Sequence, residues 1–210
     1  MWAPFPTIQF YGELVTKPAI YKYFRVILNT TKESCAISSS RYFNLQTIMG
    51  VSTFTQEYKC PIAPPRMFKA LVVDSNNLFP KLFPQFIKSV NVIQGDGGAA
   101  GSIEQVNFTE GTRFKYVKHR IDEIDEKNLV CKYTMIEGDA LGDKLESIVY
   151  EVKFEADSDG GGCICKMTSH YHMVGEFEIR KEEIEAGKDK VAGIYKIVEN
   201  YLLDNPQVYA

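Results

Sequence analysis

Hydrophobic residues recur with helical spacing between residues 181 and 203, near the C-terminus of the chain. Steps of three, four and seven residues place them on one face of an α-helix. Acidic side chains occupy the first turn, where the helix dipole favours negative charge. Asn205-Pro206 predicts the end, because proline disfavours helical geometry in the preceding residue. The apolar face of this predicted long helix comprises Ile184, Val191, Ile194, Tyr195, Val198, Tyr201 and Leu202.

Two glycines, Gly187 and Gly193, lie inside this helix, and each costs about 1 kcal/mol relative to alanine. Glycine lets a helix pack closely on a sheet. It also suits a helix that covers an internal space as a lid. The spacing leaves both interpretations open.

Before this helix, short alternating runs separated by turn signals predict β-strands. The connections between successive runs are too short for helical crossovers, which predicts an antiparallel sheet. Two proline-bounded segments, 66–74 and 78–83, predict short helices that form a V-shaped support. The predicted fold is α+β, a single domain over 49–210 in which a curved seven-stranded antiparallel sheet grips the long C-terminal helix. The predicted strands are 51–58, 87–94, 102–108, 113–124, 129–137, 145–156 and 163–173.

Residues 1–48 differ in character from the rest. They carry five basic and two acidic residues, a net charge of +3, so the remainder carries −6 of the chain's total of −3. They lack the pattern of a secretory signal, and Met49 resembles a second start. We expect a poorly ordered N-terminal extension, with a gene-model artefact and an organelle transit peptide as alternative interpretations.

The acidic charge of the main domain argues against nucleic acid as the main partner, because binding phosphates requires clustered Lys and Arg. No apolar run is long enough to span a membrane. We therefore expect a monomer in the cytoplasm, with the nucleus as a second location.

Five cysteines occur without CxxC spacing. Cys163 and Cys165 on one strand would point both thiols to the same face, which could attract a metal, as could His170 and His172. No further ligand completes either set in sequence, so we expect reduced structural cysteines, no metal and no cofactor. We also find no nucleophile with an evident base, so we expect no catalytic residues and no enzyme activity.

A glycine-rich loop contains Gly95, Gly97, Gly98 and Gly101. Such loops cradle phosphates where backbone N–H groups converge on an anion. Here Ser102-Ile103 begins a strand instead of the helix that nucleotide-binding loops require. A hairpin loop is therefore the preferred interpretation.

Bulky aromatic residues and methionine alternate along the predicted strands. Tyrosines inside a curved sheet place hydroxyl groups in an otherwise apolar space, which suits a partly polar ligand. An ordinary core with hydrogen-bonded tyrosines is an equal alternative.

Several segments resemble the plant class-10 pathogenesis-related proteins, the family of the birch-pollen major allergen. They are Met49-Gly50-Val51, LFPKLFPQFIKSV, GDGGAAGSI, FKYVKHRIDEID, YTMIEGDALGDKLE, GGGCICKMTSHYH and ENYLLDNPQVYA. The resemblance covers 49–210 and implies the helix-grip fold, with the long helix as a lid over a large cavity. It further implies a defence-related, non-catalytic carrier or sensor of small amphiphilic metabolites such as a flavonoid, cytokinin, sterol-like molecule or abscisic acid.

The resemblance assigns ligand-binding positions by motif. They are Phe79, Phe108, Phe114, Tyr116, His119, Tyr133, Met135, Ile148, Tyr150 and Val152, with Ala186 and Lys190 on the lid. The chain departs from the family pattern at Ala99-Ala100 in the glycine loop. It also has Cys131 where many relatives have tyrosine, and Glu104 where relatives often have lysine.

Three alternative functions follow from the same resemblance. Ribonuclease activity would use Glu146, Glu199 and Tyr201. An abscisic-acid-type signaling receptor would act as a protein phosphatase inhibitor, but the loop IEGDALGD lacks the Ser-Gly-Leu-Pro-Ala gate of those receptors. The alkaloid-condensing enzymes of the superfamily carry a Tyr-x-Glu motif, which here ends in lysine at Lys118.

Overall fold

The computed structural model describes residues 46–48, 50–112, 114–158, 160–175 and 181–210. Side chains are described from Gly50 onward within these ranges, except those of 181–190. The expected disorder of the extension before residue 46 therefore concerns a segment outside the described residues. None of the helices in the described ranges combines the length and hydrophobicity needed to cross a membrane.

One antiparallel sheet forms the body of the molecule, and its strands follow the spatial order β1-β2-β8-β7-β6-β5-β4-β3. The seven predicted strands are confirmed within a few residues of their expected ends. The strands are β1 (Gln46–Ile48), β2 (Val51–Cys60), β3 (Ile87–Gln94), β4 (Ile103–Phe108), β5 (Tyr116–Asp125), β6 (Val130–Gly138), β7 (Leu145–Ala156) and β8 (Cys163–Met173).

Strand β1 was not predicted, because three residues are too few to show alternation. It belongs to the extension and pairs with β2, with Ile48 opposite Val51. Strand β5 begins at Tyr116 and not at residue 113 as expected. The preceding turn ends in a short irregular stretch, where the Thr112 hydroxyl donates to the carbonyl oxygens of Thr109 and Phe114.

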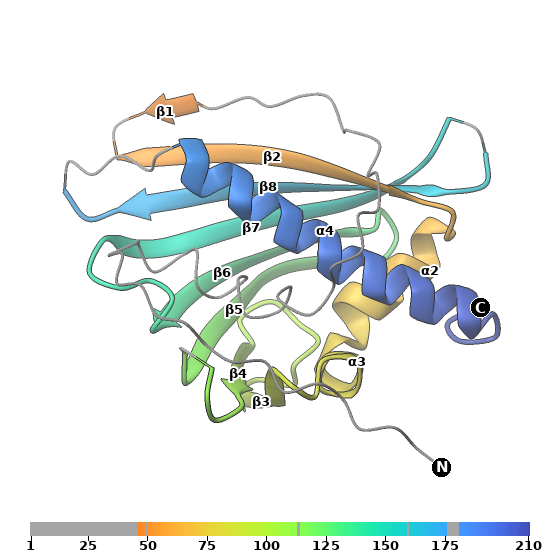
Figure 1. Ribbon diagram of the computed structural model, residues 1–210, viewed down its shortest axis with the longest axis horizontal. Coiled ribbons are helices and arrows are strands. Elements are labelled where there is room, and N and C mark those ends of the chain that lie inside the picture. Colours follow the sequence, from red (N-terminus) through yellow and green to blue (C-terminus); the bar gives the residue numbers. More distant parts are fainter. Residues whose placement is uncertain (1–45, 49, 113, 159, 176–180) are drawn as a thin grey trace, which may run out of the picture.

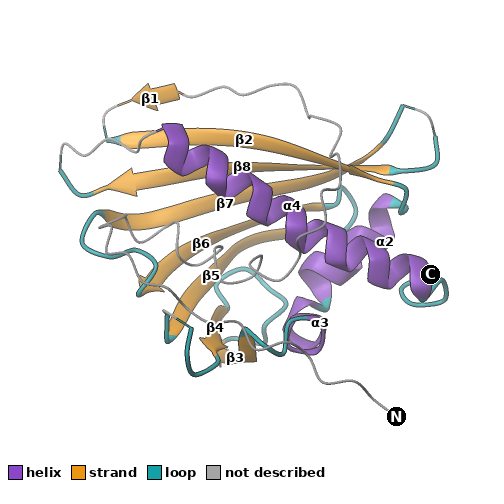
Figure 2. Ribbon diagram, viewed as in Figure 1, coloured by secondary structure: helices purple, strands orange, loops and turns teal. Residues whose placement is uncertain are grey.

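The long helix α4 (Lys181–Asp204) lies diagonally across the sheet (Figure 1). It ends directly before Asn205-Pro206, as the sequence predicts. The short helices α2 (Pro64–Phe68) and α3 (Ser75–Leu82) flank a π-helical turn, η1 (Lys69–Val73), and support one end of α4 (Figure 2). The helix-grip arrangement is thus confirmed.

Two hydrophobic clusters lie between the sheet and the helices. One gathers Met67 and Phe68 of α2, Phe154 of β7 and Val198 and Leu202 of α4. The other cluster is centred on Val117 of β5, Met135 of β6 and Ile148 of β7, and α3 packs against it. These clusters fix α4 against the concave face of the sheet.

Arg66 of α2 fastens the C-terminal end of α4. Its Nη2 donates to the carbonyl oxygens of Leu202 and Asn205 at 3.1 Å and to that of Val208 at 2.9 Å. The last carbonyls of a helix lack partners within the helix and carry partial negative charge. The guanidinium therefore pairs with one of the last carbonyls of α4, that of Leu202, and ties the helix end to the segment that follows it.

Candidate ligand-binding site

Strands β6 and β7 present alternate residues to the concave face under α4. The register places Tyr133 opposite Tyr150 and Met135 opposite Ile148. The two tyrosine rings stack, with their centroids 4.9 Å apart and an interplanar angle of 23°. Met135, Ile148 and Val152 are buried, whereas both tyrosines are only partly buried. Part of each ring is therefore accessible on a face that α4 covers.

His119 of β5 extends this aromatic group, and its ring lies edge-on to Tyr133 with 5.3 Å between the centroids. Desolvation lowers the pKa of His119 to about 4, because burial penalises the charged imidazolium. The ring is thus neutral near pH 7 and offers one donor and one acceptor. Three partly buried rings with polar atoms line this part of the concave face.

Glu104 of β4 lies opposite His119 in the register. Its Oε1 accepts a hydrogen bond of 2.6 Å from Asn76 Nδ2 on α3. Burial raises the pKa of Glu104, which the Asn76 hydrogen bond partly offsets. Glu104 thus adds a partly buried acceptor beside His119.

The other side of the concave face is formed by β2, β8 and α4. The Tyr58 ring lies 5.2 Å from that of Tyr195, and its hydroxyl donates to Glu199 Oε2. Tyr171 of β8 packs edge-on against Phe54, and burial raises the pKa of Tyr171 to about 12. Tyr58 and Tyr171 were not predicted as lining residues, although the alternation along residues 163–173 indicates the inward face of β8.

The remaining assigned positions divide into three groups. Phe79, Phe108 and Phe114 belong to the hydrophobic cluster beside the site. Tyr116 faces outward, since its hydroxyl donates to Glu137 Oε1 at 2.6 Å and Lys118 Nζ lies 5.6 Å from its ring centroid, within the range of a cation–π contact. Ala186 and Lys190 lie in α4, but their side chains are outside the described residues.

The outward position of Tyr116 corrects the expectation that it lines the cavity. The irregular stretch before β5 breaks the alternation, so that Phe114 and Val117 are buried while Tyr116 is on the opposite face. The tyrosine that was compared with the Tyr-x-Glu motif of the condensing enzymes is therefore on the outer face of the sheet.

The glycine-rich loop folds around its own carboxylate. Asp96 Oδ1 accepts hydrogen bonds from the backbone N–H groups of Gly98 at 2.9 Å and Ala99 at 3.0 Å, and from Ser102 Oγ at 3.2 Å. These bonds, the Gly98 N–H first, lower the pKa of Asp96. A carboxylate of the loop itself thus engages the backbone N–H groups of Gly98 and Ala99, which supports a hairpin loop.

His170 and His172 do share a face, as predicted, but it is the outer one. Both line a shallow groove with charged residues of β5, β6 and β7, including Arg120 and Glu151. His170 Nδ1 is 2.9 Å from the Thr53 hydroxyl oxygen. They are therefore separated from the concave face by the sheet itself.

The candidate ribonuclease residues are not assembled into an acid–base pair. Glu199 is buried, and its carboxylate accepts hydrogen bonds from the Tyr58 hydroxyl and, at 2.5 Å, from Lys196 Nζ. Tyr201 accepts a hydrogen bond of 3.2 Å from Lys81, and Glu146 is exposed on β7. The hydrogen bonds of Glu199 to Tyr58 and of Tyr201 to Lys81 instead connect α4 to β2 and α3.

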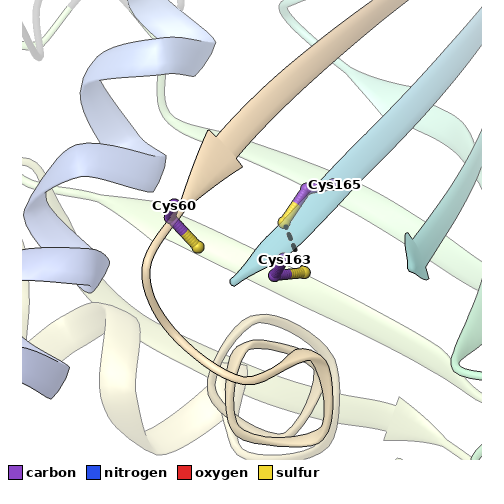
Figure 3. Close-up of side chains that lie close together, drawn as sticks. All are labelled: Cys60, Cys163 and Cys165. Carbon is purple, nitrogen blue, oxygen red and sulfur yellow. Dashed lines mark hydrogen bonds between the residues drawn. The ribbon is translucent and has the colours of Figure 1, made fainter. Parts of the chain in front are cut away.

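Three buried cysteines meet at the end of β2 and the start of β8. They are Cys60, Cys163 and Cys165 (Figure 3). Cys163 and Cys165 were predicted to share a face, but Cys60 was not predicted to join them, because the first strand was expected to end at residue 58. Cys131 is buried elsewhere on the concave face, and burial raises its pKa to about 12.

Comparison with known proteins identifies the group to which this architecture belongs. The Pathogenesis-related protein Bet v 1 family matches residues 49–205. Major strawberry allergen Fra a 1.08 of Fragaria ananassa is 52% identical over 161 residues, which are 77% of this chain and 99% of the relative. Pathogenesis-related protein STH-2 of Solanum tuberosum is 54% identical over 162 residues, 77% of this chain and 100% of the relative.

Solved structures agree with this fold. The crystal structure of Ara h 8.0201 matches 74% of this chain and 100% of its own, with 36% identity and a TM-score of 0.66. Norcoclaurine synthase from Thalictrum flavum matches with a TM-score of 0.61 and 18% identity over 82% of this chain and 100% of its own, which shows a shared fold alone. The chain belongs to the Bet v 1 family of pathogenesis-related proteins.

Proposed function

We propose that this protein is a non-catalytic carrier or sensor that binds a small amphiphilic molecule between the concave face and α4. Family membership supports a ligand-binding, defence-related role in general. The observation that carries the proposal is the group of His119, Tyr133 and Tyr150, whose rings remain partly accessible on an inward face.

The chemistry of this group favours a flat ligand with a few polar atoms. Aromatic faces stack on planar apolar rings, while the tyrosine hydroxyls and the neutral imidazole offer hydrogen bonds that orient the ligand. Glu104 adds an acceptor for a ligand hydroxyl. A flavonoid-like molecule meets these requirements best, followed by cytokinins, and sterol-like molecules use less of the hydrogen-bonding capacity.

An abscisic-acid receptor is a less favoured alternative, because a phosphatase partner needs the gate sequence that the loop at 136–143 lacks. A ribonuclease is also less favoured. Its candidate Glu199 is engaged by Tyr58 and Lys196, and two backbone N–H groups of the glycine-rich loop already donate to Asp96.

Titration of the full chain with a fluorescent apolar probe tests the proposal, followed by displacement with flavonoids, cytokinins, sterols and abscisic acid. We expect saturable binding and displacement by a planar hydroxylated subset. Tyr133→Leu or Tyr150→Leu should weaken binding about five- to tenfold, the worth of an aromatic contact. Tyr116→Leu, on the outer face, is the matched control. Equal ligand affinity of the wild type and of all three variants would refute the proposed site.

A further inference from the structure

A cluster of three thiols forms where β2 ends and β8 begins. Cys60 is the last residue of β2 and lies directly opposite Cys163, the first residue of β8. Cys165 follows two residues later and therefore points to the same face. The three sulfur atoms lie within 4.8 Å of one another, and Cys163 Sγ is 3.6 Å from Cys165 Sγ (Figure 3).

This spacing is close to that of three sulfurs on one ion. Bonds of about 2.3 Å to a thiophilic ion, at angles of about 90 to 120°, place two sulfur atoms roughly 3.3 to 4.0 Å apart. The Cys163–Cys165 distance already falls in this range. The third sulfur needs only a small shift, since all three atoms are within 4.8 Å. We propose that Cys60, Cys163 and Cys165 bind a soft, thiophilic ion with three sulfur ligands.

The surroundings select the kind of ion. The thiols belong to a hydrophobic cluster with Phe68 and Phe154, and among the described residues the group of candidate ligands stops at three. Hard cations, which prefer oxygen ligands, are disfavoured. Structural zinc takes four protein ligands, so a three-cysteine site in an apolar core suits it poorly.

Charge balance narrows the choice further. An uncompensated charge in an apolar interior is costly. Three thiolates carry −3, so Cu(I) leaves −2 and Zn(II) leaves −1, whereas trivalent arsenic gives a neutral complex. Arsenous acid and three thiols yield three As–S bonds and three water molecules, with no change of oxidation state. Of these three, trivalent arsenic therefore fits the site best.

Access to the site requires a local opening of the strand ends. Cys60 is 7% exposed, whereas Cys163 and Cys165 are 0% and 2% exposed. A Cβ at Gly162 would lie 2.5 Å from the Cys60 carbonyl oxygen, so the two segments close tightly over the thiols. Binding should consequently be slow and should begin at Cys60.

The test uses the full chain, kept reduced by a phosphine without added thiols and incubated with arsenite. Bound arsenic is counted by elemental analysis after desalting, and X-ray absorption identifies its ligands. We expect one arsenic per chain with three sulfur neighbours. Loss of one of three As–S bonds in Cys60→Ser, Cys163→Ser or Cys165→Ser should weaken binding at least about a hundredfold.

Cys131→Ser is the matched control, because Cys131 is also buried but lies outside the cluster. It should bind arsenic like the wild type. Circular dichroism of each variant checks the fold, and an increase of Tm with arsenite in the wild type shows binding to the folded state. A Tm increase with sulfur-only coordination supports the proposal even where a serine variant fails to fold.

Several results would overturn it. They are less than one arsenic per folded chain, oxygen among the ligands, or binding only after denaturation. Equal affinity of the Cys131 and Cys165 variants would also contradict the assignment. Displacement of arsenic by Cu(I) or Zn(II) at the same cysteines would refute the argument that charge balance favours trivalent arsenic.

Discussion

The Tyr58 hydroxyl donates a hydrogen bond to the buried carboxylate of Glu199, which joins β2 to α4 across the concave face. Lys196 Nζ binds the other oxygen of the same carboxylate at 2.5 Å. A buried carboxylate is tolerated only with such partners. This junction holds the C-terminal half of α4 at a fixed distance from the sheet.

Tyr58→Phe should remove the donor while keeping the ring against Tyr195. The free energy of unfolding should fall by about 1 to 3 kcal/mol, because the buried carboxylate loses a partner. Urea denaturation measures the loss. In a double-mutant cycle with Glu199→Gln, the two effects should be non-additive. Simple additivity would show that the hydrogen bond contributes little.

Arg66→Ala should destabilise the protein by about 2 to 4 kcal/mol, since several hydrogen bonds of one guanidinium to the end of α4 and to the segment after it disappear together. Thermal unfolding provides the measurement. Arg66→Lys retains the charge but cannot reach all three carbonyl oxygens. The stability of Arg66→Lys should therefore lie between those of the wild type and Arg66→Ala. Wild-type stability of Arg66→Lys would show that only the positive charge of Arg66 matters.

Stability should decline as the pH falls from about 6.5 toward 4. The folded state holds the pKa of His119 near 4, below its unfolded value of 6.5, so the unfolded chain binds a proton first in this window. Above pH 6.5 both states are neutral, and the effect is absent. It reaches at most about 3 kcal/mol. His119→Gln should flatten the difference in stability between pH 7 and pH 5, and an unchanged slope would contradict the assignment.

Gly138→Ala should destabilise the fold by about 2 kcal/mol or more. Gly138 has φ +132°, and a Cβ there would lie 2.6 Å from the Tyr116 carbonyl oxygen and 2.7 Å from Val117 Cα. Backbone atoms cannot move aside cheaply. Gly161→Ala is the control, because nothing lies within 4 Å of its Cβ position, and it should stay within about 0.5 kcal/mol of wild type. Equal denaturation midpoints of the two variants would refute the argument.

Periodicity predicted most of the fold, because its signals are local. The end of α4 at Asn205-Pro206 and the seven strands follow from the spacing of apolar residues and from turn residues. The family resemblance added what spacing leaves open, namely that the long helix covers the sheet as in the helix-grip fold. Strand β1 escaped prediction because its formation depends on the edge that β2 offers.

The sites were harder to predict, because they depend on register. Tyr116 was assigned to the inside, since alternation was continued from Phe114 through a stretch that is not a strand. Cys60 was overlooked because it lies 103 positions before Cys163 and meets it only through the pairing of β2 with β8. Tyr133 and Tyr150 were assigned by their family motifs, and the register of β6 with β7 places them opposite each other.

The position of the ligand is the most direct test of the proposed function. The chain has three histidines, with His119 on the concave face and His170 and His172 on the outer face. NMR of the imidazole signals, recorded with a ligand that displaces the probe, distinguishes the two faces. We predict that the signals of His119 shift on saturation while those of His170 and His172 stay unchanged. A shift confined to the outer pair, or none at all, would contradict binding beneath α4.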